Sequence, residues 1–260
     1  MRVAAVGFSC MDVYENLDRR YPTGNGVDFV IKLAGLGVET SVVSAVGTDE
    51  YGSDTIRTLK ERGIDTSHLH VQNGETAVIK MSLIDNDRVH GDQTDGVMAN
   101  FSLTDGDFEF IKSYDYIHTD LFGRIYGLLP VFRKAGCKVV FDFSVFLNDK
   151  DVSLILPHVD YAFFSYGKPD TEIESFLKKM HCMGPRIVTA TLGEYGSVSY
   201  DGTEFYKAGI VPVEVVNTVG AGDSYIAGFM YGIMNDKSIP ECQISGATFA
   251  SETIRNFEPY

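Results

Sequence analysis

Apolar, β-branched segments alternate with segments of helical spacing along this chain, and that alternation restricts its fold more than any other feature. The apolar run from Val3 to Val6 ends at Gly7, as a buried strand would, and near-helical spacing follows between Val27 and Gly37. The pattern predicts further strands at 41–46, 114–118, 138–143, 159–165 and 186–191, and further helices at 51–62, 121–135 and 171–180. Strands and helices in alternation form a mostly parallel sheet with helices on both faces. The prediction is an α/β fold.

Two stretches depart from this pattern. Residues 12–16 alternate polar and apolar side chains, and residues 76–89 do the same up to a turn-like Asp85-Asn86-Asp87. Period-two alternation around such a turn predicts an antiparallel ribbon. A small β-sheet over a crevice fits this ribbon, and so does an edge hairpin without a function. Because no repeat or linker interrupts the chain, we expect one domain, 1–260, with lid segments near 12–20 and 75–92.

The charge balance excludes some partners. The chain has 22 basic and 36 acidic residues, for a formal net charge of −14. Nucleic acids and anionic membrane surfaces attract basic proteins, so neither is an expected partner, whereas a cationic or zwitterionic small substrate is tolerated. No apolar run approaches the length of about 18 residues that a membrane span needs. The four cysteines lack the spacing of a zinc or redox motif, so we expect no protein-held metal and a cytoplasmic location.

The most informative segment lies near the C-terminus. A β-branched run at 210–216 predicts a strand, and the glycine-rich stretch 217–224 then leads into a helix that ends near Asn235. The first turn of a helix has unpaired N–H groups and the positive end of the helix dipole, and glycines let an anion approach them. Asp223, in that turn, suits two roles: it caps the helix, or it is a general base beside a developing phosphoryl charge. The P-loop and dinucleotide-binding glycine patterns are both absent.

These segments carry a resemblance to a known family. The stretch Thr218-Val219-Gly220-Ala221-Gly222-Asp223-Ser224 resembles the C-terminal signature of the ribokinase-like (PfkB) sugar kinases. Collinear matches to other motifs of that family cover nearly the whole chain: 7–12, 24–25, 46–52, 63–67 and 191–196. Segments 68–70, 85–101 and 141–144 are most similar to the bacterial fructoselysine 6-kinases within it. The resemblance implies a three-layer α/β/α sandwich with a small β-sheet lid.

The resemblance also implies a role for each matching residue. Asp223 matches the catalytic base that takes the proton of the sugar hydroxyl. The other implied positions are Gly220, Ala221 and Gly222 for an anion hole, Asp12, Gly24 and Asn25 for sugar contact, and Thr191, Gly193 and Gly196 for the nucleotide. Arg88, in the predicted lid, could reach the substrate or the phosphates, and a solvated salt bridge explains it equally well. The implied cofactors are Mg²⁺ and ATP as co-substrate, and a homodimer is the expected assembly.

The chain departs from the family pattern at three places. Asn217 stands where the family often has an Asp that helps to hold a monovalent cation, so activation by such a cation is open. Asp28 stands where the sugar motif usually ends in Asn; a second carboxylate suits a substrate with an ammonium group, or caps the helix. The NxxE motif that organises magnesium is missing, with Ser165 and Lys168 at its Asn and Glu positions. Mg²⁺ would then rest on nucleotide phosphates and water.

The expected function is ATP-dependent phosphorylation of a fructosamine, such as fructoselysine, at its 6-hydroxyl. A ketose, a sugar acid or a different fructosamine are alternative substrates for the same chemistry. A sugar-binding regulator without turnover, on the same fold, is the alternative of another class. The sequence leaves open which amine the sugar carries, the cation requirement and the oligomeric state.

Overall fold

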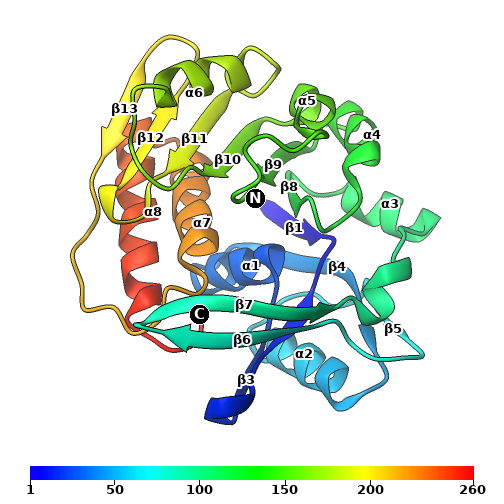
Figure 1. Cartoon of the computed structure of the whole chain (residues 1–260). Helices are drawn as coiled ribbons and strands as arrows, with labels where there is room; N and C mark the ends of the chain where they lie inside the picture. The colour runs from blue at the N-terminus through cyan, green and yellow to red at the C-terminus, as the bar shows by residue number, and fades with distance from the viewer.

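Two separate β-sheets organise the computed structural model, which describes residues 1–260 (Figure 1). The main sheet has nine strands: β1 (Arg2–Val6), β4 (Glu39–Gly47), β5 (Leu69–Gln72), β8 (Tyr116–Asp120), β9 (Lys138–Asp142), β10 (Tyr161–Ser165), β11 (Ile187–Thr191), β12 (Ser197–Tyr200) and β13 (Phe205–Ala208). Their spatial order is β13-β12-β11-β10-β9-β8-β1-β4-β5. Every neighbouring pair from β5 to β11 is parallel, and β12 and β13 add an antiparallel edge.

The small sheet has four strands in the order β3-β2-β6-β7. They are β2 (Cys10–Tyr14), β3 (Arg19–Thr23), β6 (Val78–Ile84) and β7 (Asp87–Thr94). The β6–β7 pair is the antiparallel ribbon predicted from the alternation at 76–89, and its turn is formed by Asp85 and Asn86, both with positive φ. The ribbon pairs with the other departing stretch, because β2 runs parallel to β6.

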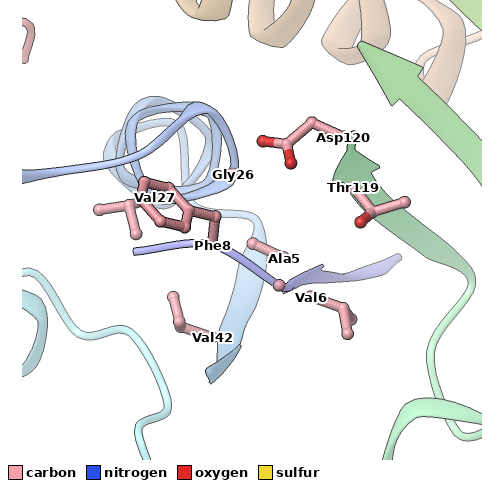
Figure 2. A pocket seen from close by; sticks show the side chains of 9 residues that line it. Ala5, Val6, Phe8, Gly26, Val27, Val42, Thr119 and Asp120 are labelled. Carbon is pink, nitrogen blue, oxygen red and sulfur yellow. The ribbon is translucent and has the colours of Figure 1, made fainter. Parts of the chain in front are cut away.

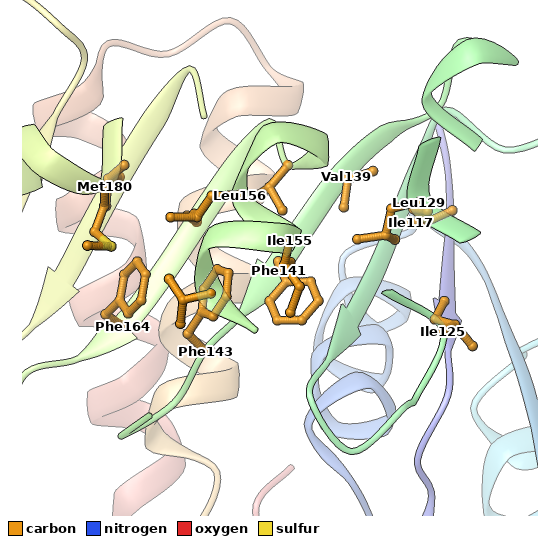
Figure 3. Close-up of a cluster of buried hydrophobic side chains, with 14 of the residues drawn as sticks. Ile117, Ile125, Leu129, Val139, Phe141, Phe143, Ile155, Leu156, Phe164 and Met180 are labelled. Atoms are coloured by element: carbon orange, nitrogen blue, oxygen red, sulfur yellow. The ribbon is translucent and has the colours of Figure 1, made fainter. Parts of the chain in front are cut away.

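Helices cover both faces of the main sheet. They are α1 (Asn25–Gly35), α2 (Glu50–Glu61), α3 (Asp105–Ile111), α4 (Leu129–Lys134), α5 (Val152–Ile155), α6 (Ile173–His181), α7 (Ala221–Met234) and α8 (Ile239–Ile254). Successive strand residues point to opposite faces. Phe141 and Phe164 therefore pack with α3 to α6 (Figure 3), and Val140 and Phe163 pack with α1, α2, α7 and α8. No helix has both the length and the apolar character to cross a membrane.

Two predicted elements differ from the structure. The predicted strand at 210–216 is wrong: the segment is irregular and largely exposed, Pro212 has no N–H to donate, and no strand lies beside it. The predicted helix at 121–135 is shorter, because Arg124 adopts a positive φ and Pro130 occupies the first turn of α4, which begins at Leu129. The glycine-rich turn before α7 thus follows an irregular segment instead of a strand.

One side chain ties the two sheets together at the end of β4. Asp49 is the N-cap of α2, where its carboxylate accepts the Gly52 N–H at 2.9 Å. The same carboxylate accepts the Thr76 N–H at 2.8 Å and the Thr76 hydroxyl at 2.6 Å, just before β6. Burial of the Asp49 carboxyl raises its pKa, but these hydrogen bonds outweigh that effect and hold the pKa below its usual value.

We expect Asp49→Ala to lower the free energy of unfolding by about 1–3 kcal/mol, because an N-cap and the partner of a buried hydroxyl are both lost. Chemical denaturation at pH 7 measures the change. Asp49→Asn is the matched control; it keeps an acceptor for the cap and should lose less. Equal stability of the alanine variant and the parent would contradict this role.

Candidate active site

The carboxyl ends of neighbouring parallel strands meet at one edge of the main sheet. β1, β8 and β9 are adjacent, and Asp120 at the end of β8 is opposite Asp142 at the end of β9. Helix α1 begins at the same edge, where Asn25 donates its amide N–H to the Asp142 carboxylate at 3.0 Å. Such an edge of an open parallel sheet is where ligands bind in α/β proteins.

A cavity of about 290 Å³ lies between this edge and the small sheet. Its lining brings together the predicted base and all five predicted substrate contacts: Asp12, Gly24, Asn25, Asp28, Arg88 and Asp223. Gly220 also lines it, and Gly222 lies in the same turn of α7. Residues that are far apart in the sequence thus share one cavity.

The first turn of α7 presents free backbone donors. Gly220 precedes the helix with a φ of 69°, in the left-handed region that favours glycine. The N–H groups of Gly220 and Gly222 have no hydrogen-bond partner within the protein, whereas the Ala221 N–H makes a long bond of 3.3 Å to the Thr218 carbonyl. Two of the three predicted anion-hole donors are therefore available to a ligand.

Buried carboxylates surround this turn. Burial, with the charge of Asp142 next in importance, raises the pKa of Asp223, while Arg88 opposes the rise. Burial likewise raises the pKa of Asp12 to about 7 and that of Asp142 to about 6, again against Arg88. The site therefore contains more carboxyl groups than the single positive charge of Arg88 can compensate.

Asp28 is the most confined of these acids. It lies in the first turn of α1 with 2% of its surface exposed, and its Oδ2 accepts the Thr23 hydroxyl at 2.7 Å. Its Oδ1 is buried without a hydrogen-bond partner. Burial, and then the charge of Asp223, raise the pKa of Asp28 well above its usual value. Helix capping does not explain this residue, because no side-chain cap is formed at the start of α1.

Asp120 and Asp142 were not among the residues predicted for the site. A small cavity of about 10 Å³, with room for about one water, separates β1, β8 and α1, and Asp120 lies on its wall (Figure 2). The Asp120 carboxylate accepts the Gly123 N–H at 2.8 Å, and burial raises its pKa to about 7. A polar residue at the end of a buried strand is the signal that could have identified both.

Arg88 joins the tip of the β6–β7 ribbon to the loop before α7. Its guanidinium donates to the Thr218 carbonyl at 2.9 Å, and its own N–H donates to the Thr218 hydroxyl at 3.2 Å. Asn86 adds two bonds: its carbonyl accepts the Thr218 N–H, and its amide donates to the Val215 carbonyl at 3.0 Å. We call these contacts of Asn86 and Arg88 with 215–218 the latch. The solvated salt bridge considered for Arg88 is not formed.

The residues predicted for the nucleotide lie elsewhere on the same edge. Thr191 ends β11, and Gly193 begins the turn that follows it with a φ of 56° and open space where a side chain would be. Gly196 has a structural reason to be glycine, because a Cβ there would lie 2.0 Å from the Ala208 carbonyl oxygen. None of the three lines the cavity described above.

No group of three or more histidine, cysteine, aspartate or glutamate side chains is placed to hold a metal ion. The side chain of Asn217 is buried and engaged: its amide donates to the Phe257 carbonyl at 2.9 Å, and its Oδ1 accepts the Val219 N–H at 3.1 Å. A carboxylate could not make the first of these bonds. Whether a monovalent cation acts on the protein stays a prediction.

Comparison with known proteins adds three findings. The family model "pfkB family carbohydrate kinase" matches residues 15–260. Fructoselysine 6-kinase of Escherichia coli is 35% identical over 97% of both chains, and fructosamine kinase FrlD of Bacillus subtilis is 29% identical over 97% of this chain and 90% of that protein. The structure of Arabidopsis thaliana ribokinase complexed with ribose and ATP superimposes with a TM-score of 0.84 at 20% identity, covering 99% of this chain and 93% of that one. The predicted ribokinase-like fold is confirmed.

Asp28→Asn should stabilise the protein in a pH-dependent way. The folded state raises the pKa of Asp28 above its unfolded value of about 3.9, so the folded protein holds the proton more tightly and loses stability as pH rises past that value. Asparagine has no such proton. We expect the melting temperature at pH 8 to rise by about 2–4 °C, as 1 kcal/mol would give in a chain of this size.

The gain should shrink toward pH 4, where the aspartate is protonated in the folded state and about half protonated in the unfolded state. Thermal unfolding at pH 4, 6 and 8 tests this. Glu61→Gln, the same change at an exposed carboxylate on α2, is the control. A gain that does not depend on pH would contradict the electrostatic explanation.

Proposed function

The chain belongs to the pfkB family of carbohydrate kinases, and on that premise we propose that it transfers the γ-phosphoryl group of ATP to the 6-hydroxyl of a fructosamine such as fructoselysine. The family predicted from the sequence is confirmed by the comparisons. The observation that carries the finer proposal is the cavity in which Asp223 and the free N–H groups of α7 adjoin buried carboxylates. The names of the two bacterial relatives support the same substrate class.

Asp223 is the proposed general base. It lines the cavity within one turn of the unpaired N–H groups of Gly220 and Gly222. A carboxylate with a raised pKa accepts a proton more readily near neutral pH than an ordinary one. While Asp223 takes the proton of the hydroxyl, the N–H groups at the positive end of α7 stabilise the charge that develops on the transferred phosphoryl group.

The charge of the cavity favours an amine-bearing sugar. Asp12, Asp28 and Asp223 line it against a single cationic side chain, Arg88. His90 also lines the cavity, but burial, and then Arg88, lower its pKa, which keeps the ring neutral. An ammonium group would compensate the buried carboxylates, whereas a sugar acid would add a further negative charge.

The nucleotide is proposed to lie along the loop after β11, with Thr191, Gly193 and Gly196. The open space beside Gly193 leaves room for close approach of a ligand to the backbone. No three acidic or histidine side chains are grouped to hold a metal ion, and Ser165 and Lys168 supply no carboxylate, so the protein residues do not fit a resident Mg²⁺ site. Mg²⁺ would enter with ATP as part of the substrate, held by phosphates and water.

The small sheet is proposed to be the lid. Residues of β2, β3 and β7 line the cavity, and the latch holds the β6–β7 tip against the loop before α7. A closed lid excludes water, which would otherwise compete with the sugar for the phosphoryl group. The homodimer stays a prediction.

The first test is an assay of ADP release with ATP, Mg²⁺ and four sugars: fructoselysine, fructose, ribose and 2-keto-3-deoxygluconate. We expect a clear preference for fructoselysine. Asp223→Asn should reduce turnover about 10²–10⁴-fold, as loss of a general base does, while sugar binding measured by calorimetry persists. Preference for another sugar would overturn the fructosamine assignment, and full turnover by Asp223→Asn would overturn the assignment of the base. Binding of fructoselysine without turnover by the parent would favour the regulator.

Arg88 should determine the pH at which kcat/KM rises on the acidic side of the pH profile. Its positive charge favours the ionised form of Asp223 and so lowers the pKa of that carboxyl. In Arg88→Gln this effect is lost, and we expect the rise of kcat/KM with pH to move to higher pH. Arg88→Lys is the matched control, because it keeps the charge and should return the limb toward the parent's position. An unmoved limb in Arg88→Gln would show that Arg88 does not act on the base.

A further inference from the structure

Three aromatic side chains follow the ends of three neighbouring strands and line the cavity. Phe8 follows β1, Phe122 follows β8 and Phe146 follows β9. The rings of Phe8 and Phe122 are 5.9 Å apart, and those of Phe122 and Phe146 are 5.7 Å apart. We call these three rings the aromatic rim. The function proposed above gives them no role.

The aromatic rim lies at the opening of the cavity, whereas the carboxylates lie deep. Phe122 and Phe146 are 39% and 38% exposed, while Asp12 and Asp28 are 3% and 2% exposed. Val145, beside Phe146, also lines the cavity and is 66% exposed. The cavity therefore changes from acidic inside to apolar on the side of its opening that the loops after β8 and β9 form. Apolar side chains that gather at a polar site mark a place where a ligand covers them.

The loops that carry the rim are held in place. After β9, Ser144 adopts a positive φ of 49°, and its N–H donates to the Asp142 carboxylate at 2.7 Å. After Phe122, Arg124 adopts a positive φ of 55° and donates to the Ala99 carbonyl at 3.1 Å and to Asp95 at 2.7 Å. Non-glycine residues in this conformation cost free energy, and such strain persists where surrounding contacts impose it, often at ligand sites.

We infer that the aromatic rim is a subsite for the alkyl part of the amine substituent on the sugar. This inference rests on the proposed function. A fructosamine carries its amine on C1, the end of the sugar opposite the 6-hydroxyl. When the 6-hydroxyl lies at the half-buried Asp223, the substituent on C1 is at the far end of the sugar, and the proposal places it against the exposed rings of the rim. Methylene groups gain free energy on leaving water for the rings, while the amine nitrogen, which is bonded directly to C1, stays with the sugar among the carboxylates.

The consequence is a preference for fructosamines with an alkyl chain of several carbons over those with a short or polar substituent. Full burial of one methylene group is worth about a fourfold change in affinity at 25 °C. Contacts made equally to the substrate and to the transition state change KM and leave kcat unaltered. The rim should therefore act through KM.

The test is a series of 1-alkylamino-1-deoxyfructoses with methyl, propyl, butyl and hexyl substituents, assayed for kcat and KM with the intact protein. We expect kcat/KM of the parent to rise about two- to fourfold per methylene from methyl to butyl, through KM. In Phe122→Ala and Phe146→Ala the rise should flatten, so that the hexyl compound loses at least about tenfold and the methyl compound much less. Both rings are partly exposed, so truncation leaves no closed cavity, and thermal unfolding checks that the variants are folded.

Leu154→Ala is the matched control, because Leu154 is 65% exposed and does not line the cavity. It should show the chain-length series of the parent. Phosphorylation of all four compounds with equal kcat/KM would overturn the subsite and leave the fructosamine kinase in place. Equal losses for the methyl and hexyl compounds in the phenylalanine variants would also overturn it. If the parent phosphorylates a simple ketose but none of the four compounds, the proposed function fails, and the subsite fails with it.

Discussion

Parallel pairing of neighbouring strands is the constraint from which the site follows. Because β1, β8 and β9 run in the same direction, the residues after each of them emerge at one edge of the sheet. That edge receives Asp120, Asp142 and the three rings of the aromatic rim, together with the first turns of α1 and α7. The strands and helices that contribute these residues are far apart in the sequence. A slip of one residue in a strand would turn its side chains to the opposite face and disperse the group.

The same edge concentrates negative charge at a cost to stability. Burial raises the pKa of every carboxyl in the group, because a low-dielectric environment disfavours the ionised form. Among the charged side chains of the cavity, Arg88 is the one that lowers the pKa of Asp12, Asp142 and Asp223. Selection for stability alone would favour neutral side chains at these positions. Their presence is understandable if they serve a substrate that brings positive charge and a hydroxyl proton to accept.

The small sheet connects this chemistry to the opening of the cavity. Through the latch, Asn86 and Arg88 at the ribbon tip contact the loop before α7. The strand that carries the Arg88 guanidinium therefore also holds the segment that leads into the free N–H groups of α7. Tyr14 of β2 packs against Phe257, with ring centroids 4.9 Å apart, and Asn217 donates to the carbonyl of Phe257. Movement of the lid would therefore displace the start of α7, where the proposed base and anion-hole donors lie.

The sequence by itself determined the α/β class, most of the strands and helices and the antiparallel ribbon, because periodicity encodes them within short segments. Its motifs resemble those of the pfkB family, and that resemblance pointed to the cavity residues Asp12, Asn25 and Asp223. The sequence did not determine the length of α4, because Arg124 adopts a left-handed conformation that the local sequence does not indicate. It also did not determine the lack of a strand at 210–216, because a strand needs a neighbouring strand to pair with. Only the tertiary structure decided that Asp120, Asp142 and the aromatic rim share one edge with Asp223. The physical reason is that strand order decides which side chains become neighbours, and burial decides how strongly their charges interact. Both depend on contacts between residues far apart in the sequence.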